Sequence, residues 1–221
     1  MTISSGILAG VWIDLSWYLF ALLTVLALIR APWFRLVESD SSNIYFASIV
    51  ILLVLWQIRA SIIPGQEFHF LGVGAATLMF GWEFAFLAVQ ILLVTGIVLS
   101  GSSWDSFAMN SLLLGAIPAG LTHVSLRLSQ RFLPHNFFIY IFLNAFIISG
   151  LGIMLTGTVL YYLLMHSHAP LSQQMQSDYL IVLLMTAIPE GTINGMTITS
   201  LIVYKPQWVT TFRDNIYLSK K

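Results

Sequence analysis

Long apolar runs, interrupted by very few charged residues, constrain this chain more than any other feature of its sequence. Hydrophobic residues make up 58% of the chain and charged residues only 8%, and the mean hydropathy is +0.88. A helix that crosses a bilayer needs about 20 predominantly apolar residues, because hydrocarbon leaves unpaired backbone groups unsatisfied. The sequence therefore predicts an all-α integral membrane protein that crosses the membrane several times.

The charge balance, the missing cysteines and the missing motifs exclude several kinds of function. Nine basic and nine acidic residues give a formal net charge of zero, so no nucleic-acid-binding surface is expected. The absence of cysteine removes disulfides, thiolate metal sites and iron–sulfur clusters. The sequence has no GxSxG, HExxH or Walker A motif, so an enzyme is not expected.

Seven apolar segments, bounded by charged or turn residues, are expected to cross or enter the membrane. They are residues 11–29, 44–63, 67–80, 83–100, 107–128, 136–164 and 178–203. The third is short, because about 12 residues rise only about 18 Å and the hydrocarbon core is about 30 Å thick. It is expected to be a half-helix, and the alternative joins residues 67–100 into one long helix.

The distribution of lysine and arginine favours a break near Gly81–Trp82 over the joined helix. With seven segments and the N-terminus outside, every lysine and arginine except Arg59 falls on the cytoplasmic side, as the positive-inside rule requires. They are Arg30, Arg35, Arg127, Arg131, Lys205, Arg213, Lys220 and Lys221. We therefore expect one helical bundle over residues 1–204 and a short cytoplasmic interfacial tail over residues 205–221, in an inner (plasma) membrane.

Polar residues inside the apolar segments are costly in a bilayer and are therefore candidates for function. Arg59 lies near the outer end of its segment, where it either snorkels to the interface or pairs with Asp14. Glu190 follows Pro189, which leaves a carbonyl group unpaired four residues back. Glu190 is expected either as a functional carboxylate in a helix break or, preferably, as a packing carboxylate bonded to Asn194 at i+4. The full set is Asp14, Arg59, Glu83, Asn110, Asn144, Glu190 and Asn194.

The histidines divide between the two sides of the membrane in this topology. His69, His166 and His168 are expected at the outer face, whereas His123 and His135 lie near cytoplasmic helix ends. Imidazole nitrogen binds borderline divalent metals such as nickel and cobalt. Three histidines on one rim could therefore meet around a metal ion.

Three segments, taken in order, resemble the cobalt/nickel substrate-binding membrane subunits of energy-coupling factor transporters, the CbiM/NikM type. The segment HFLGVGAATLMFGWEFA at 69–85 is similar to the family's HLLGGxLAxxLxGPWxA, and FAMNSLLLGAIPAGL at 107–121 to its ALGANxxNMxxxxPxxG. The segment AIPEGTINGMTIT at 187–199 is similar to its AVIEGLITA helix. The resemblance implies a bundle of about seven spans that captures a divalent cation from outside.

The resemblance also implies partners and ligands. The family works with a transmembrane coupling subunit and two cytoplasmic ATPases, and the metal is its substrate rather than a permanently bound cofactor. In the family the metal is held by the free N-terminal amine, by a second-position histidine and by the histidine of the HLLG motif, which here is His69.

The second position is where this chain departs from the family, because it carries Thr2 in place of the histidine. A hydroxyl is a poor ligand for a borderline metal. One hypothesis keeps a metal site of altered preference, in which the amine of Met1 and His69 are joined by His166 or His168. The other holds that the fold captures another small solute or serves as a non-transporting assembly or interaction subunit.

Overall fold

The computed structural model describes residues 2–3, 6, 8, 10–37, 41–63, 66–167, 173–213 and 217, and most of them are helical. Five helical stretches in this part of the chain are long and apolar enough to cross a membrane. They are α1 (Gly10–Arg30), α5 (Trp82–Ser100), the stretch formed by α6 (Phe107–Ser111), η1 (Leu112–Ala116) and α7 (Ile117–Phe132), the stretch formed by α8 (Phe137–Ile139), η2 (Tyr140–Ile147) and α9 (Ile148–Met165), and α10 (Gln173–Tyr204). The all-α membrane fold is thus confirmed, while the orientation in the membrane stays a prediction.

The predicted span over residues 44–63 is wrong in its second half. After the four-residue helix α2 (Phe34–Val37), helix α3 covers only Ser41–Leu55, and the chain then continues as strand β2 (Arg59–Ile63). Isoleucine favours extended structure, and the Pro-Gly pair that follows the strand in the sequence favours a turn. Arg59 therefore does not lie in a spanning helix, and its side chain is outside the described part of the molecule.

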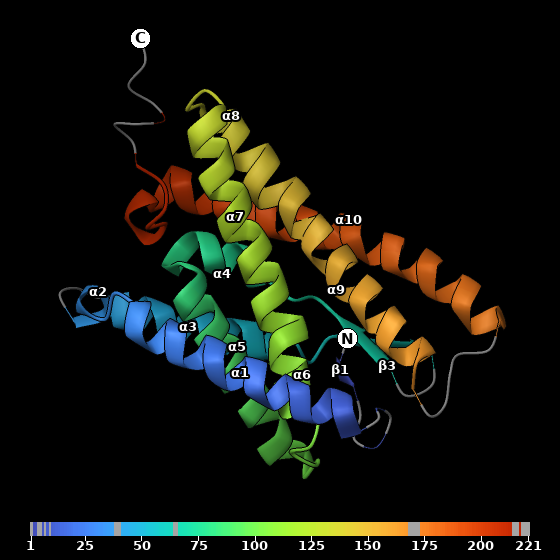
Figure 1. Ribbon diagram of the computed structural model, residues 1–221. Coiled ribbons are helices and arrows are strands. Elements are labelled where there is room, and N and C mark those ends of the chain that lie inside the picture. The colour runs from blue at the N-terminus through green and yellow to red at the C-terminus, as the bar shows by residue number, and fades with distance from the viewer. Residues whose placement is uncertain are drawn as a thin grey trace.

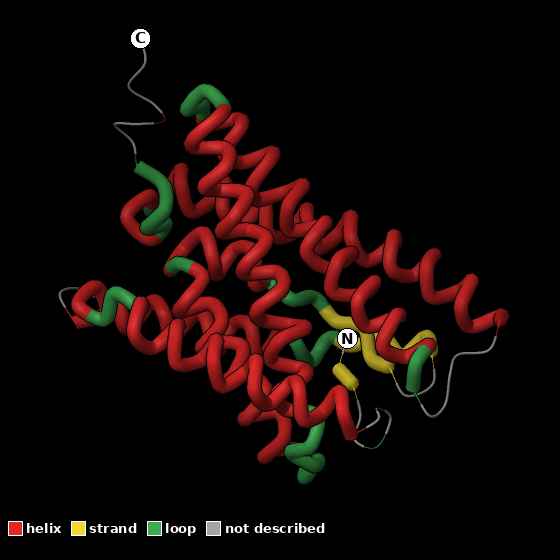
Figure 2. The backbone as a smooth tube through the Cα atoms, in the orientation of Figure 1, coloured by secondary structure: helices red, strands yellow, loops and turns green. Residues whose placement is uncertain are grey.

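A three-stranded antiparallel sheet, which the sequence did not predict, lies at one end of the bundle (Figure 2). Its central strand is β3 (Gln66–His69), which pairs with β2 on one side and with β1 (Thr2–Ile3) on the other. Thr2 lies opposite Glu67, and Arg59 lies opposite His69. The sheet therefore brings the start of the chain beside the segment that contains His69.

The predicted break between a half-helix and a full span is confirmed. Helix α4 (Val73–Phe80) has only eight residues, all buried, and packs against α5, α7, α9 and α10 (Figure 1). Gly81 follows it with φ of 96°, a conformation that side-chain-bearing residues rarely adopt, and α5 begins at Trp82. The short α4 can be buried on all sides because longer helices surround it.

Helices α9 and α10 approach closely because glycines lie at their contact. A Cβ atom added to Gly150 would lie 2.9 Å from the carbonyl oxygen of Ala187, and one added to Gly191 would lie 2.6 Å from that of Phe146. Small residues of this kind allow helix backbones to pack tightly in lipid. Helix α10 also continues through Pro189 without a break, which contradicts the less favoured alternative that placed Glu190 in a helix break.

The part of residues 205–221 that the structure describes packs against the bundle. The Thr210 N–H donates to the carbonyl oxygen of Met79 at 2.9 Å, and the Thr211 hydroxyl donates to that of Leu78 at 2.6 Å. The rings of Phe212 and Tyr217 stack with centroids 5.0 Å apart. This segment covers the C-terminal end of α4, and its assignment as a separate cytoplasmic tail stays a prediction.

We expect Gly191→Ala to lower the free energy of unfolding by about 1–3 kcal/mol, because the new methyl group meets a backbone oxygen that cannot move independently of its helix. Unfolding of the purified protein by denaturing detergent measures the change. Gly120→Ala in α7 is the matched control, because a Cβ there has no neighbour within 4 Å. Equal stabilities for the two variants would contradict close packing of α10 against the continuous stretch of η2 and α9.

Candidate functional site

The candidate site lies where the sheet meets the buried half-helix, and His69 is its central residue. His69 ends β3 and is only 6% exposed. Its ring packs against the indole of Trp56 with centroids 4.5 Å apart. The Trp56 Nε1–H in turn donates to the carbonyl oxygen of Leu71 at 3.1 Å. Trp56 therefore fixes both the imidazole ring and the chain that follows it.

The hydrogen bond of the His69 ring assigns its tautomer. Nδ1 lies 3.0 Å from the carbonyl oxygen of Phe70, and a carbonyl oxygen only accepts hydrogen bonds. Nδ1 therefore carries the proton, and the lone pair of the neutral ring belongs to Nε2. A metal-binding imidazole commonly donates its other N–H to a backbone carbonyl in this way, which fixes the ring orientation.

Glu190 and Asn194 of α10 hold the segment between His69 and α4. The N–H groups of Leu71 and Gly72 donate to Glu190 Oε2 and Oε1 at 2.8 and 2.9 Å. Asn194 accepts from the N–H of Ala75 at 2.7 Å and donates through Nδ2 to Glu190 Oε1 at 2.8 Å. Glu190 is 2% and Asn194 1% exposed. This α10 clamp is the structural arrangement, with the i+4 bond, that the sequence favoured for Glu190.

The α10 clamp satisfies backbone groups that would otherwise be orphaned in a membrane interior. The first N–H groups of a helix have no partner within the helix, and burial without one is costly. A carboxylate at this position also interacts favourably with the positive end of the α4 dipole. The left-handed conformation of Gly72, with φ of 68°, turns the two N–H groups of the segment toward one carboxylate. The segment that follows His69 is therefore held by α10, which lies more than 100 residues further along the chain.

Asn110 of α6 holds the other strand of the site. Its Oδ1 accepts from the N–H of Ile3 at 2.8 Å, and its Nδ2 donates to the carbonyl oxygen of Ile3 at 3.1 Å. Asn110 and Ile3 are 6% and 3% exposed. The amide thus replaces a neighbouring strand for β1, on the side that β3 does not cover. Sequence analysis identified Asn110 as a costly polar residue but did not identify its partner.

The remaining predicted site residues are not gathered around His69 in the described structure. His166 is exposed at the end of α9, where its ring contacts that of Tyr162 in a tilted arrangement with centroids 4.3 Å apart, and its Nδ1 lies 2.9 Å from the Tyr162 carbonyl oxygen. Asp14 is exposed on α1, and its predicted pairing with Arg59 falls outside the described part of the molecule, because the Arg59 side chain is not described. Met1 and His168 lie outside the described residues. No three His, Asp or Glu side chains in the described ranges lie close enough together to hold a metal ion.

Comparisons with known proteins give a family and a fold. A family model described as the cobalt uptake substrate-specific transmembrane region, CbiM, matches residues 2–208. One solved structure, of a transition metal transporter, shares 14% sequence identity at a TM-score of 0.68 and covers 91% of this chain and 92% of its own. A truncated transition metal transporter shares 16% identity at a TM-score of 0.68 and covers 92% of this chain and 99% of its own. No curated protein sequence matches this chain.

We expect Glu190→Ala to destabilise the protein by about 2–5 kcal/mol, because it leaves the buried N–H groups of Leu71 and Gly72 without an acceptor. Glu190→Gln keeps one carbonyl oxygen and is expected to cost less. The free energy of unfolding measures both. Asp178→Ala, which removes an exposed carboxylate from the same helix, is the control and is expected to change little. A Glu190→Ala variant as stable as this control would contradict the α10 clamp.

Proposed function

Because this chain belongs to the CbiM family, the substrate-specific transmembrane region of cobalt uptake, we propose that it captures a cobalt- or nickel-like divalent cation for an energy-coupling factor transporter. The family match makes it a metal-uptake component of the membrane rather than an enzyme. Its apolar helices make it a multi-pass membrane protein, and as a transporter component it is located in the plasma membrane. What we propose beyond this is the identity of the metal and the assembly with the other subunits of an energy-coupling factor transporter.

The position of His69 beside the first strand is the observation that carries this proposal. Backbone pairing between β1 and β3 places Thr2 and Ile3 next to the strand that ends in His69. Asn110 holds β1 from one side, and the α10 clamp holds the segment after His69 from the other. A binding site built on backbone groups from the start of the chain requires such fixed positions, because ligands must be preorganised around the cation.

The proposed ligand set combines His69 with the start of the chain and with a histidine from the segment that follows α9. We assign Nε2 of His69, the amine of Met1, and an imidazole of His166 or His168 as the donors. Nitrogen ligands of this kind suit nickel and cobalt. His166 would have to leave its position against the Tyr162 ring to contribute. Thr2 supplies no imidazole, so the loop histidines are the available replacements.

The energy source for transport must come from partner subunits. The sequence contains no Walker A motif, and we propose that a transmembrane coupling subunit and cytoplasmic ATPases supply this function. Helix α1 leaves an apolar surface exposed along much of its length, including Val11, Tyr18, Leu22 and Ile29. This surface suits contact with lipid or with the spanning helices of a coupling subunit.

A second candidate function rests on Thr2. Without the second-position imidazole, the same fold could capture another small solute or act as a non-transporting assembly or interaction subunit. This candidate predicts that the purified protein binds no divalent transition metal, and it leaves His69 as a packing residue beside Trp56.

We expect the purified protein, with no residue preceding Met1, to bind nickel or cobalt with one ion per chain. We expect His69→Ala to weaken binding by at least about 100-fold, because it removes a ligand rather than a supporting group. Isothermal titration calorimetry measures the affinity. His135→Ala is the matched control. His135 lines a separate hollow together with Arg127 and Arg213, away from the sheet. Unchanged binding by His69→Ala, or no binding by the natural protein, would contradict metal capture at this site.

We expect Thr2→His to tighten nickel and cobalt binding, because it restores a nitrogen donor beside β3. The same titration compares it with Thr2→Ser, which keeps a hydroxyl. If only Thr2→His binds metal and the natural protein binds none, the second candidate function is favoured.

A further inference from the structure

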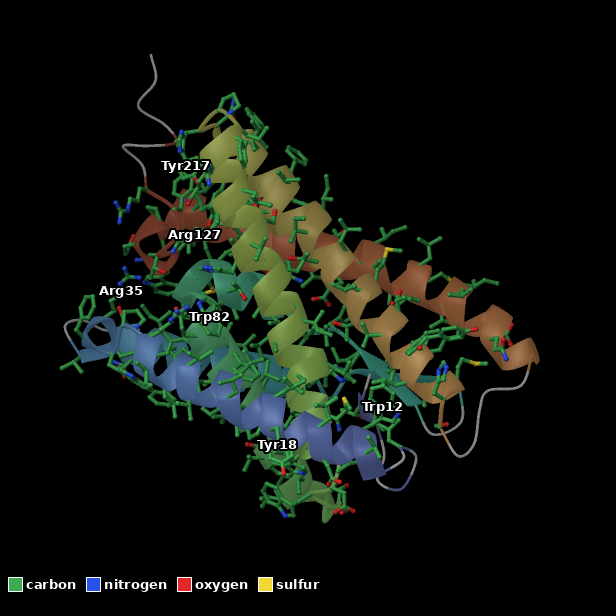
Figure 3. All side chains as sticks on the ribbon, viewed as in Figure 1. Trp12, Tyr18, Arg35, Trp82, Arg127 and Tyr217 are labelled. Atoms are coloured by element: carbon green, nitrogen blue, oxygen red, sulfur yellow. The ribbon has the colours of Figure 1, made fainter. Side chains whose placement is uncertain are left out.

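A hollow lined by arginines lies at the end of the molecule opposite the sheet. Arg30, Arg35, Arg127 and Arg213 line it, and Glu83 is the only acidic residue of the lining within the part of the chain that the structure describes. We call it the basic hollow, and its volume is about 500 Å³. Figure 3 shows Arg35 and Arg127 toward this end, away from Trp12 and Tyr18. The arginines expected on the cytoplasmic side of the membrane therefore gather in one concave surface.

The lining residues place the basic hollow at the depth of lipid headgroups. Arg30 is the last residue of α1, and Arg127 lies in the last turns of the stretch that ends at Phe132. Both stretches are long and apolar enough to cross the membrane, so their ends lie at its interface. Trp82, which begins α5, lies near Arg127 and Arg35 in the same view (Figure 3), as expected for the aromatic residues of an interface.

The positive charge of the basic hollow is not balanced by the protein residues that the structure describes. Within these residues, no ion pair joins a carboxylate to any of the four arginines, and Glu83 is a single negative charge among them. The guanidinium of Arg35 instead stacks on the ring of Phe34 at 5.8 Å. Like charges that share one concave surface repel each other, and a multivalent anion between them would offset this repulsion.

Neutral hydrogen-bond donors complete the lining. The Gln130 side chain donates to the Tyr217 hydroxyl oxygen at 3.1 Å, so the hydroxyl proton is available to another acceptor. Burial raises the pKa of Tyr217, which keeps this hydroxyl protonated at neutral pH. Arginine forks and a hydroxyl donor together match the oxygens of a phosphate group.

We propose that the basic hollow binds a phosphate-bearing anion, with Arg127 and Arg213 as its principal contacts. Two sources share this chemistry, namely the headgroup of an anionic phospholipid in the surrounding membrane and a free phosphate compound such as a nucleotide. The proposal does not depend on metal capture, because the basic hollow and His69 lie at opposite ends of α4.

The test uses the full chain purified in detergent, with ligand-induced stabilisation as the readout, since a ligand that binds the folded state raises the unfolding temperature. The lipid probe is phosphatidylglycerol in mixed micelles, compared with phosphatidylcholine. The soluble probes are inorganic phosphate and ATP, compared with chloride at equal ionic strength. Stabilisation by phosphatidylglycerol alone identifies a headgroup site, and stabilisation by phosphate or ATP identifies a site for a free anion; either result supports the proposal.

The Arg127→Gln/Arg213→Gln variant is expected to bind the effective probe at least about tenfold more weakly, because each lost arginine removes charge-assisted hydrogen bonds. Lys205→Gln is the matched control, because it removes one exposed positive charge near the end of α10 without touching the basic hollow. Arg213→Gln alone serves if the double variant does not fold, which its size-exclusion profile and its unligated unfolding temperature show. The proposal is overturned if no probe stabilises the protein, or if Lys205→Gln weakens binding as much as the arginine variants do.

Discussion

The carboxylate of Glu190 is the group on which the arrangement of this protein depends most. It accepts the N–H groups of Leu71 and Gly72, which precede a helix too short to cross the membrane. In a bilayer these groups have no water to bond with, so a half-helix is tolerated only where protein supplies the partners. The close α9–α10 approach, with Gly191 directly beside Glu190 in the chain, positions α10 to supply them. Without this acceptor the N–H groups of Leu71 and Gly72 would be buried with no partner from α10.

The half-helix α4 links the two polar regions of the molecule. Its N-terminal side follows His69 and the sheet, and its C-terminal end, at Phe80 and Gly81, lines the basic hollow. The segment of Thr210 and Thr211 bonds to carbonyl oxygens in the last turn of α4. One buried element of eight residues is therefore in contact with both ends of the bundle, while the longer helices around it provide the apolar surface that faces lipid.

The fold is shared with transition metal transporters at only 14% and 16% sequence identity, so it is kept although few residues are identical. The residues that the structure singles out form backbone contacts: Asn110 holds Ile3, and Glu190 and Asn194 hold the start of α4. Such contacts maintain the frame whatever residue occupies position 2. A change at Thr2 can therefore alter ligand chemistry while the frame that surrounds it is kept.

Interactions between residues close in sequence were determined by the sequence itself. The apolar runs specify helices, Gly81 ends the half-helix, and the four-residue spacing of Glu190 and Asn194 places them on one helix face. Only the tertiary structure decided the partners that lie far apart. Asn110 bonds to Ile3 across 107 residues and Glu190 to Leu71 across 119, and strand β1 at Thr2 pairs with β3 at Glu67. The physical reason is that helix periodicity is satisfied within one segment, whereas a strand, a buried amide or a shared hollow needs a partner that local sequence does not specify.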